Sequence, residues 1–388
     1  MIRKTAALVL VFLYIFFTIN VHAQSNYASS MLIEMHSGRV LYESNSDKKK
    51  LIASTTKIMT AILAIENSNI NETVKVGNEV LKMYGTNIYI QPGEVITIED
   101  LLHGLILRSG NDAAVVLATY IGGTEEKFVD MMNQKARELG MSQTNFQNPH
   151  GLDDYTENYS TANDMALLSK YAYKNNVYKK IAGKKKYSTT TQNKSYLWYN
   201  RNKLLSQYEF CTGGKNGYTP KAGRTLVTTA EKNNMQLTAV TLNINNEYEY
   251  HQTLYQKAFN KYKMYKIIDK DNFKISHAEY DSPTLTESFY YPLTNSEKQE
   301  ISTEIIFYAQ QQHNKIGYIN IKLKDKKIGS LEIYDIPQKK EDISIFVKLK
   351  NYLFDILKKL ILGRQNNLNP GPFVPTPLDI YKFPSSIL

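Results

Sequence analysis

Ser54 and Lys57, in the segment ASTTK, form the first pair of side chains in the sequence that could do covalent chemistry together. A serine hydroxyl is a weak nucleophile at neutral pH and needs an adjacent base. Three residues apart on a helix, the two side chains lie on the same face. Lys57 could accept the serine proton if burial and neighbouring positive charge hold it neutral. The spacing alone is a weak signal, because a serine cap followed by a lysine occurs in many helices.

A second candidate element is Ser109-Gly110-Asn111, which ends an apolar helical run in the segment LLHGLILRSGNDAA. A loop at this place can offer the Ser109 hydroxyl for proton relay. The Asn111 amide can hold a substrate beside it. We therefore expect both side chains in the same site as Ser54.

The third element is Lys215-Asn216-Gly217, in GGKNGYTPKAGRTL. Its glycines permit a close approach of the backbone, and Lys215 supplies positive charge near the active serine. Three such elements in this order and approximate spacing form a strong signal for an active site built on a serine and a lysine.

Around these elements the sequence predicts alternating strand and helix regions. Apolar runs at 31–35 and 40–42 flank turn residues, which is a β-hairpin pattern. Residues 54–67 repeat apolar side chains at helical spacing, with Ser54 near the helix start. Residues 98–173 contain several helices, one of them ended by Gly140. The runs at 223–230 and 237–244 predict an antiparallel pair of strands.

The pattern changes after about residue 265, where long helical repeats give way to short alternating runs. The clearest run predicts a hairpin with Ile319, Ile321 and Leu323 on one face and a turn at residues 324–326. We assign residues 24–262 to a catalytic domain and residues 263–338 to a small β-rich domain.

Both ends of the chain carry segments of a different kind. Residues 1–23 place two basic residues before an apolar run and a Val-x-Ala site, which predicts a secretory signal peptide, with a retained membrane anchor as the alternative. Residues 339–364 predict an amphipathic helix, apolar on one side and lysine-rich on the other. Such a helix suits the membrane interface, or packing on the β-rich domain or in an oligomer. The proline-rich tail, residues 365–388, has no core-forming pattern.

Composition narrows the function classes further. The 388 residues carry a formal net charge of +10, which we attribute to scattered surface lysines and which suits a cell-envelope location. Export excludes nucleic acid as a partner. The single cysteine, Cys211, excludes an intramolecular disulfide and has no evident base partner, so we expect an idle thiol.

With these motifs in place, the chain resembles the penicillin-recognising serine D-Ala-D-Ala carboxypeptidases, the low-molecular-mass penicillin-binding proteins, from about residue 27 to 337. The segments IASTTKIMTAILAIE, LLHGLILRSGNDAAVVLA, NPHGLDDYTENYSTANDMALL and GYTPKAGRTLV are typical of that family. The resemblance implies an α+β fold, with an antiparallel sheet sandwiched by helices, a helical insertion and a β-rich C-terminal domain. It also implies attachment to the outer face of the bacterial cytoplasmic membrane through a C-terminal helix.

The resemblance also implies roles for single residues. Ser54 would be the acylated nucleophile, Lys57 the general base and Ser109 the proton relay. Asn111 would bind the substrate amide and Lys215 the substrate carboxylate. The remaining predicted contacts are the backbone N–H groups of Ser54 and Tyr218, as an oxyanion hole. The substrate would be a peptidoglycan stem peptide ending in D-Ala-D-Ala, with β-lactam antibiotics as covalent inhibitors and no metal or other cofactor.

One departure from the family pattern is Asn216, where Lys-Thr-Gly is usual and a hydroxyl commonly contacts the substrate carboxylate. An asparagine N–H can still donate to that carboxylate, so we expect altered affinity rather than lost chemistry. Arg224, at the start of the next strand, could supply compensating charge. Gly217 is unchanged from the pattern.

Two other functions remain as alternatives. A β-lactamase shares the three motifs, but class A enzymes add a water-activating glutamate for which the sequence shows no convincing loop candidate. A non-catalytic envelope scaffold would have no physical need to keep Ser54, Lys57 and Lys215. We expect His150 to order its loop rather than act as a base, and Asp153 and Asp154 to serve as turn and cap residues.

Overall fold

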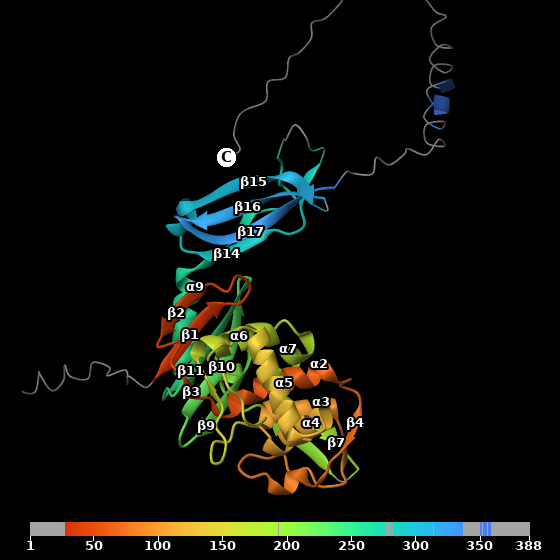
Figure 1. Cartoon of the computed structure of the whole chain (residues 1–388), viewed down its shortest axis with the longest axis vertical. Coiled ribbons are helices and arrows are strands. Elements are labelled where there is room, and N and C mark those ends of the chain that lie inside the picture. The colour runs from red at the N-terminus through yellow and green to blue at the C-terminus, as the bar shows by residue number, and fades with distance from the viewer. Residues whose placement is uncertain are drawn as a thin grey trace, which may run out of the picture.

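The computed structural model describes residues 28–192, 194–275, 280, 282–312, 314–336, 350, 352–354 and 356–357. The predicted signal peptide (1–23) and tail (365–388) lie outside the described residues, as does most of the predicted amphipathic helix. The described chain forms two lobes, a larger mixed one and a smaller one made of strands (Figure 1). The prediction of a domain boundary at residue 262 falls between the last helix of the larger lobe and the next strand.

A five-stranded antiparallel sheet forms the centre of the larger lobe, in the order β2-β1-β11-β10-β9. Its strands are β1 (Ser29–Glu34), β2 (Val40–Ser44), β9 (Cys211–Thr219), β10 (Gly223–Lys232) and β11 (Met235–Leu242). The predicted hairpin at 31–42 is confirmed as β1 and β2, and the predicted pair of strands as β10 and β11. The segments that carry Ser54 and Lys215 meet at the β9 edge of this sheet.

Helices cover both faces of the sheet because successive strand side chains point to opposite sides. On one face, Leu32, Leu237 and Ala239 pack under α9 (Glu247–Lys261). On the other face, Met31, Ile33 and Val240 join the main core. That core includes α2 (Lys57–Asn67) and α6 (Ala162–Ala172).

The helical region between the strands holds one side of the site. It comprises α3 (Ile98–His103), the π-helical turn η3 (Gly104–Arg108), α4 (Asn111–Gly122) and α5 (Glu125–Glu138). Shorter elements surround it: β3 (Lys50–Leu51), β4 (Thr73–Lys75), η2 (Asn78–Lys82), β5 (Val95–Thr97), β6 (Tyr159–Ser160), α7 (Asn176–Ala182), β7 (Lys186–Thr190), β8 (Ser195–Tyr199) and α8 (Leu204–Gln207). Thr97, Thr124 and Thr161 cap α3, α5 and α6, each accepting the N–H three residues on.

The predicted start of the helix at Ser54 is wrong in one respect. Residues Ala53–Thr56 form a 3-10 turn, η1, and the α-helix begins only at Lys57. The hydroxyls of Thr55 and Thr56 donate to the carbonyls three residues back, which favours the tighter turn. In a 3-10 turn, side chains at i and i+3 eclipse each other, so Ser54 and Lys57 still share one face.

The smaller lobe consists of β12 (Lys263–Ile268), β13 (Pro283–Leu285), β14 (Phe289–Leu293), η4 (Glu297–Glu300), β15 (Ile301–Gln312), β16 (Lys315–Leu323) and β17 (Lys326–Asp335). Four of the strands form an antiparallel sheet, in the order β13-β17-β16-β15. The predicted hairpin is confirmed as β16 and β17, with Leu323 opposite Lys326. Ile319 and Ile321 are buried in the core of this lobe.

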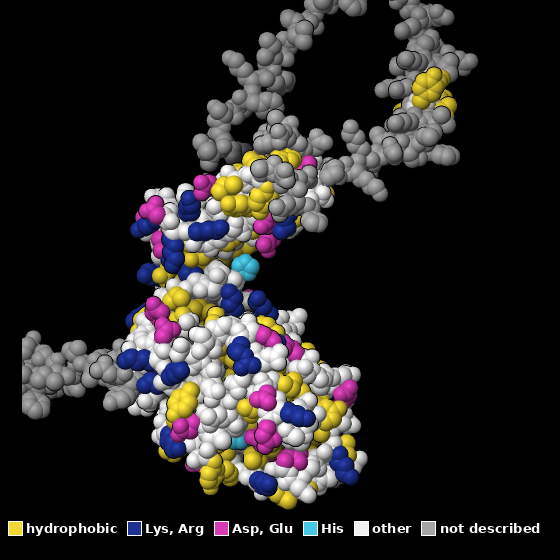
Figure 2. Space-filling model, in the orientation of Figure 1, with side chains coloured by type: hydrophobic (Ala, Val, Ile, Leu, Met, Phe, Trp, Pro, Cys, Tyr) yellow, Lys and Arg dark blue, Asp and Glu magenta, His cyan; other side chains and the backbone are white. Residues whose placement is uncertain are grey.

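Arg39, in the turn between β1 and β2, ties the two lobes together at the waist visible in Figure 2. Its guanidinium donates to the Pro292 carbonyl at 2.5 Å and pairs with Glu297 at 2.5 Å. The same group lies 5.0 Å from the ring centroid of Tyr262 and 5.2 Å from that of Tyr291. The contact therefore combines an ion pair with cation–π packing.

Only a few residues of the predicted amphipathic helix are described. Residues 352–354 and 356–357 are helical, and the apolar side chains among them are exposed. Within the described part of the chain, no helix has the length and apolar character needed to cross a membrane.

Candidate active site

Ser54 and Lys57 are in hydrogen-bonding contact at the start of α2. The Lys57 Nζ lies 3.0 Å from the Ser54 Oγ. Ser54 is partly exposed, whereas Lys57 is fully buried. A nucleophile open to a ligand and an amine shielded from water are what the predicted chemistry requires.

Two further acceptors surround the lysine nitrogen. Lys57 Nζ donates to the Asn111 Oδ1 at 2.8 Å and to the His150 carbonyl at 2.5 Å. An ammonium has three protons, and these three acceptors use all of them. Loss of one proton leaves a neutral amine that is still oriented by two hydrogen bonds.

The electrostatic surroundings favour that neutral amine. Burial lowers the pKa of Lys57 well below its usual value, and the nearby charges of Lys215 and Arg201 lower it further. The carboxylate of Asp112 opposes them. Burial, followed by the charge of Arg201, lowers the pKa of Lys215 to about 7. The charge of Lys215 therefore destabilises the protonated form of Lys57.

Asn111 brings the predicted second motif to Lys57. Its Nδ2 donates to the Tyr84 carbonyl at 2.7 Å, while its Oδ1 accepts from Lys57. Ser109, two residues earlier, is buried and has a left-handed φ of 68° at the end of η3. A non-glycine residue in that region is strained, which is common at functional sites.

Asp112 was not predicted, yet it fixes this side of the site. Its buried carboxylate accepts the backbone N–H groups of Ile88, Tyr89 and Ile90, as well as that of Ala113. It thereby holds the loop before β5 against the start of α4. The sequence offered one signal, an acidic residue directly after Asn111 in the first turn of a helix.

Strand β9 carries the third predicted motif past Ser54. A β-carbon added at Gly217 would lie 2.8 Å from the Ser54 backbone nitrogen, so the strand and the η1 turn are in van der Waals contact. The Lys215 side chain is fully buried, and its Nζ donates to the Asn216 carbonyl at 2.7 Å. Thr225, on the neighbouring strand, donates to the Ile52 carbonyl at 3.1 Å.

The remaining predicted residues lie at the outer end of the same strands. The Tyr218 side chain is 62% exposed, so only its backbone could line an oxyanion site. Arg224 is opposite Tyr218 in the sheet register and lies over its ring. Arg224 also pairs with Glu247 at 3.5 Å. Its charge is therefore shared with a carboxylate of the protein itself.

The loop after α5 closes the site from a third side. Gly151, with a φ of 88°, passes so close that a β-carbon there would meet the Ala53 carbonyl and the Ser54 nitrogen. The Nδ1 of His150 accepts the Leu152 N–H at 3.1 Å. Burial and the charge of Lys57 lower the pKa of His150 to about 3. A neutral imidazole that orders its own loop agrees with the expectation for His150.

The acidic pair in this loop also has structural partners. Thr219, on β9, donates its hydroxyl to the Asp153 carboxylate. Tyr84 donates to the Asp154 carboxylate at 2.6 Å. These contacts join the loop to β9 and to the segment before β5. Among the residues that the structure describes, no group of three His, Cys, Asp or Glu side chains could hold a metal ion.

Arg201 is the other functional candidate that sequence reasoning missed. It follows β8, donates to the Thr86 hydroxyl at 3.0 Å and lowers the pKa of both Lys57 and Lys215. Nothing in the local sequence identifies Arg201 as a functional residue. Its position depends on strand β8 returning to the η3 turn, where the Arg201 N–H donates to the Leu107 carbonyl.

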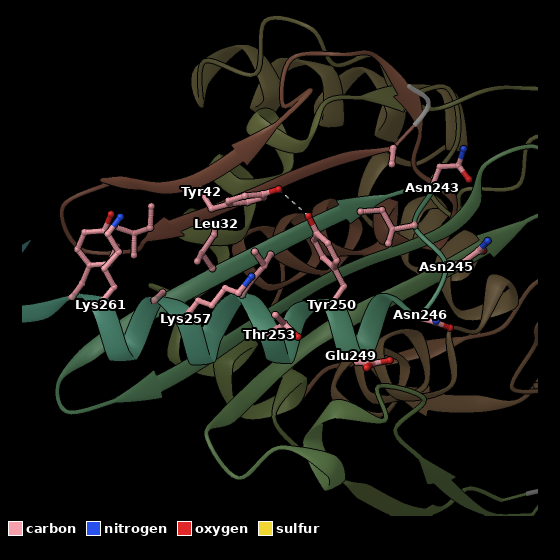
Figure 3. A pocket seen from close by; sticks show the side chains of 16 residues that line it. Leu32, Tyr42, Asn243, Asn245, Asn246, Glu249, Tyr250, Thr253, Lys257 and Lys261 are labelled. Atoms are coloured by element: carbon pink, nitrogen blue, oxygen red, sulfur yellow. Dashed lines mark hydrogen bonds between the residues drawn. The ribbon is translucent and has the colours of Figure 1, made fainter. Parts of the chain in front are cut away.

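A separate groove of about 890 Å³ lies between α9 and the β1–β2 edge of the sheet (Figure 3). Tyr250 donates to Tyr42 across it at 3.1 Å, and Lys257 and Lys261 lie along its helical side. None of the predicted catalytic side chains lines this groove. Its volume therefore says nothing about the Ser54 chemistry.

Comparison with known proteins identifies the family of this chain. The profile of the peptidase S11 family, described as D-alanyl-D-alanine carboxypeptidase, matches residues 18–246. The chain belongs to this family. The predicted resemblance is thereby confirmed, as is the α+β fold.

Individual relatives show how far the similarity extends. The D-alanyl-D-alanine carboxypeptidase DacF of Bacillus subtilis is 38% identical over 218 residues, covering 55% of this chain and 56% of that protein. DacC of Escherichia coli is 37% identical over 224 residues, covering 55% of each chain. The chain thus spans about half the length of these curated relatives. The crystal structure of penicillin binding protein 5 from Haemophilus influenzae has a TM-score of 0.68 and 26% identity, covering 81% of this chain and 98% of that one.

Proposed function

We propose that this protein is an exported D-alanyl-D-alanine carboxypeptidase that removes the terminal D-alanine of peptidoglycan pentapeptides through an acyl-enzyme on Ser54. The observation that carries the proposal is the 3.0 Å contact between a buried Lys57 amine and a partly exposed Ser54 hydroxyl. Family membership and the relatives named DacF and DacC support the same substrate class.

In the acylation step, neutral Lys57 takes the proton of Ser54 as the Oγ attacks the carbonyl carbon of the penultimate D-alanine. The carbonyl oxygen gains negative charge, which the backbone N–H groups of Ser54 and Tyr218 would stabilise. Collapse of this intermediate breaks the peptide bond. The departing amine takes a proton from Lys57, relayed through Ser109, and leaves as D-alanine.

In the deacylation step, water attacks the ester carbonyl and gives its proton to Lys57. The Ser54 oxygen leaves and recovers a proton, which restores the free enzyme and releases the shortened peptide. A β-lactam would follow the acylation step only, because its ring opens without a group departing. We therefore expect a long-lived penicilloyl ester on Ser54.

Substrate orientation would come from Asn111, Lys215 and the β9 edge. The Asn111 amide would bind the substrate amide, and Lys215 would attract the terminal carboxylate. Asn216 would donate an N–H to that carboxylate in place of the usual hydroxyl. Arg224 would add charge if a ligand carboxylate replaces Glu247 as its partner. Peptide added along an exposed sheet edge is a common recognition mode.

The location of the protein is a further part of the proposal. The N-terminal pattern supports export, and the exposed apolar side chains Tyr352, Leu353, Phe354 and Leu357 support attachment to a membrane surface. Binding of the full chain to anionic lipid vesicles tests this part separately. Substitution of Leu353 and Phe354 by Ser should release the protein, whereas unchanged binding would contradict the proposal.

The decisive experiment is intact mass spectrometry after exposure to benzylpenicillin, with D-alanine release from a D-Ala-D-Ala peptide measured in parallel. The native protein should gain one antibiotic mass and release D-alanine. Ser54→Ala should do neither, and Ser206→Ala, at an exposed serine elsewhere, should behave as native. A native protein without label would indicate a non-catalytic scaffold. Rapid turnover of a chromogenic cephalosporin would indicate a β-lactamase.

A further inference from the structure

The positive charge of the chain is concentrated in one segment. Residues 165–208 contain ten Lys and Arg residues and no Asp or Glu. The rest of the chain then holds 37 basic and 37 acidic residues, so this segment accounts for the whole net charge of +10. The expectation of scattered lysines was wrong, because it considered the total charge and not its distribution along the chain.

The fold carries this segment along the larger lobe and brings its lysine run at 184–186 beside Arg201. The segment runs from α6 through α7 and the β7–β8 hairpin to α8. Lys186 is opposite Tyr199 in the hairpin register, and the Asn200 N–H donates to the Lys185 carbonyl at 2.8 Å. The Asn200 side chain donates to the Lys184 carbonyl at 3.0 Å. These bonds hold the lysine run beside Arg201.

We call these ten cations the basic surface: Lys170, Lys174, Lys179, Lys180, Lys184, Lys185, Lys186, Lys194, Arg201 and Lys203. Seven of them are exposed, and Lys170, Lys179 and Lys184 are partly buried. Within the described part of the chain, only Lys179 has a carboxylate within ion-pairing distance, Glu231 at 3.7 Å. Lys170 also lies close enough to Glu34 and Lys174 for both charges to act on it, in opposite senses.

Ordinary structural roles explain some of the ten cations but not the others. Cations at the C-terminal ends of helices interact favourably with the helix dipole, which accounts for Lys170 in α6 and Lys179 and Lys180 in α7. Lysines also keep surfaces soluble, but natural surfaces usually intersperse both signs of charge. Carboxylates from elsewhere in the chain contact this segment at Tyr171, Tyr187 and Tyr196, but the segment itself contributes none in 44 residues.

The shape of the basic surface points to a chain-like ligand. None of its ten residues lines any of three well-formed cavities in the described structure. Open, distributed ammonium groups act as point charges that suit repeated phosphates rather than a single enclosed ligand. The expected export excludes a nucleic acid.

The course of the basic segment through the fold favours a linear polymer as its ligand. The basic segment starts in α6, next to the smaller lobe, and continues through α7 to β7 at the far side of the larger lobe (Figure 1). A linear polymer can follow such a track along the lobe. A polymer extending from the membrane could reach it.

We propose that the basic surface binds a linear polyanion with repeated phosphate groups and holds the catalytic lobe on such an envelope polymer. Binding releases counterions from the polymer, so the affinity falls steeply as salt rises. Arg201 belongs to this surface and its charge also acts on Lys57, so the surface reaches the neighbourhood of the Ser54 site. The proposal adds a partner and does not depend on the reaction at Ser54.

The test uses fluorescent long-chain inorganic polyphosphate and the full chain in anisotropy titrations between about 50 and about 200 mM salt. The variant Lys174→Gln, Lys180→Gln, Lys185→Gln, Lys186→Gln removes four exposed charges from the basic surface. The matched control, Lys75→Gln, Lys127→Gln, Lys257→Gln, Lys326→Gln, removes four exposed charges elsewhere, so both variants have the same net charge. Thermal unfolding and penicillin labelling show that each variant is folded and active.

We expect the surface variant to lose on the order of tenfold in affinity at low salt, with a flatter salt dependence, and the control to change by about twofold or less. Equal losses in both variants would show that only net charge matters and would overturn the proposal. The proposal would also be overturned if the native protein does not bind polyphosphate. The same holds if the four lysines are needed for binding to phosphatidylglycerol vesicles and the protein does not bind polyphosphate. If the fourfold variant does not fold, the pair Lys185→Gln, Lys186→Gln gives the same comparison against Lys75→Gln, Lys127→Gln.

Discussion

Gly217 and Ser54 are in backbone contact, because a β-carbon at position 217 would lie 2.8 Å from the Ser54 nitrogen. The contact joins the β9 edge of the sheet to the turn that carries the candidate nucleophile. It also leaves the Ser54 N–H next to the strand where the substrate is expected to bind.

The first prediction follows from this contact. Gly217→Ala should slow acylation by penicillin by about a hundredfold or more, since one displaced oxyanion donor alone costs about that much. Stopped-flow labelling measures the rate, and thermal unfolding measures the stability. Gly140→Ala is the control: its φ of 75° strains an alanine, but no atom lies within 4 Å of the added carbon. The control should lose stability and keep its acylation rate. A native rate in Gly217→Ala would contradict the assigned geometry.

The second prediction concerns the base. Lys57→Met keeps an unbranched side chain in the buried site and removes the amine, so the acylation rate should fall by about a thousandfold. Lys82→Met, on an exposed lysine, should acylate at the native rate. The second-order rate constant for penicillin is the quantity to compare. General-base catalysis usually contributes about a hundredfold or more. A loss of about tenfold or less would therefore assign the base to another group.

The third prediction is a pH dependence with two limbs. Activity should rise with pH as Lys57 loses its proton, at a pH well below the usual range for lysine because burial lowers its pKa. It should fall as Lys215, whose pKa is about 7, loses the charge that attracts the substrate carboxylate. Lys215→Arg keeps that charge at all working pH values, so the alkaline limb of kcat/KM should move to higher pH.

A substrate with an amidated C-terminus provides the control for this profile. Without the carboxylate, the native enzyme should be slower and should lose the alkaline limb. The alkaline limb could stay at the same pH both in Lys215→Arg and in the native enzyme with the amidated substrate. That result would show that a group other than Lys215 causes the alkaline limb. The two lysines interact, so the observed values describe the pair.

The fourth prediction concerns Arg224. If the substrate carboxylate recruits this side chain, Arg224→Ala should lower kcat/KM for a D-Ala-D-Ala peptide by on the order of tenfold. Glu247→Gln should have the opposite effect, because it frees Arg224 from its 3.5 Å ion pair. Lys261→Ala, at the far end of α9, serves as the control. An unchanged kcat/KM in Arg224→Ala removes this residue from the site.

The fifth prediction concerns the ion pair between the lobes. Arg39 and Glu297 are only 13% and 22% exposed, so a double-mutant cycle of Arg39→Met and Glu297→Gln should give a coupling energy of about 1 to 3 kcal/mol. Additive effects in the cycle would show that the pair does not couple the lobes. Urea unfolding at neutral pH supplies the free energies.

The same pair should respond to acid. Burial acts to raise the pKa of Glu297, but the hydrogen bonds from Arg39 and Thr294 and the charge of Arg39 together outweigh it, and the pKa falls to about 2. A lowered acid pKa stabilises the folded state above the ordinary value of 4.5. That contribution is lost as the pH falls from there through about 2. Glu297→Gln should flatten this part of the pH–stability curve, and an unchanged slope would argue against the pair.

The sequence determined the local elements of this protein. Ser54 and Lys57 lie within one turn, so their shared face follows from spacing alone, whether the turn is α-helical or 3-10. The alternation of side chains at residues 223–244 likewise predicts two strands without reference to the rest of the fold. The ordered triplets then indicated the family before any distance was known.

Only the tertiary structure decided how these elements act on one another. The lowered pKa of Lys57 depends on burial and on Lys215 and Arg201, which the chain brings close from more than 140 residues away. Asp112 and Gly217 gain their roles from the loop at residues 88–90 and the turn at Ser54, and no local pattern encodes those partners. The strand order β2-β1-β11-β10-β9 sets these distances. Short spacing fixes which side chains share a face, whereas a pKa depends on every charge and every solvent-excluding atom around it.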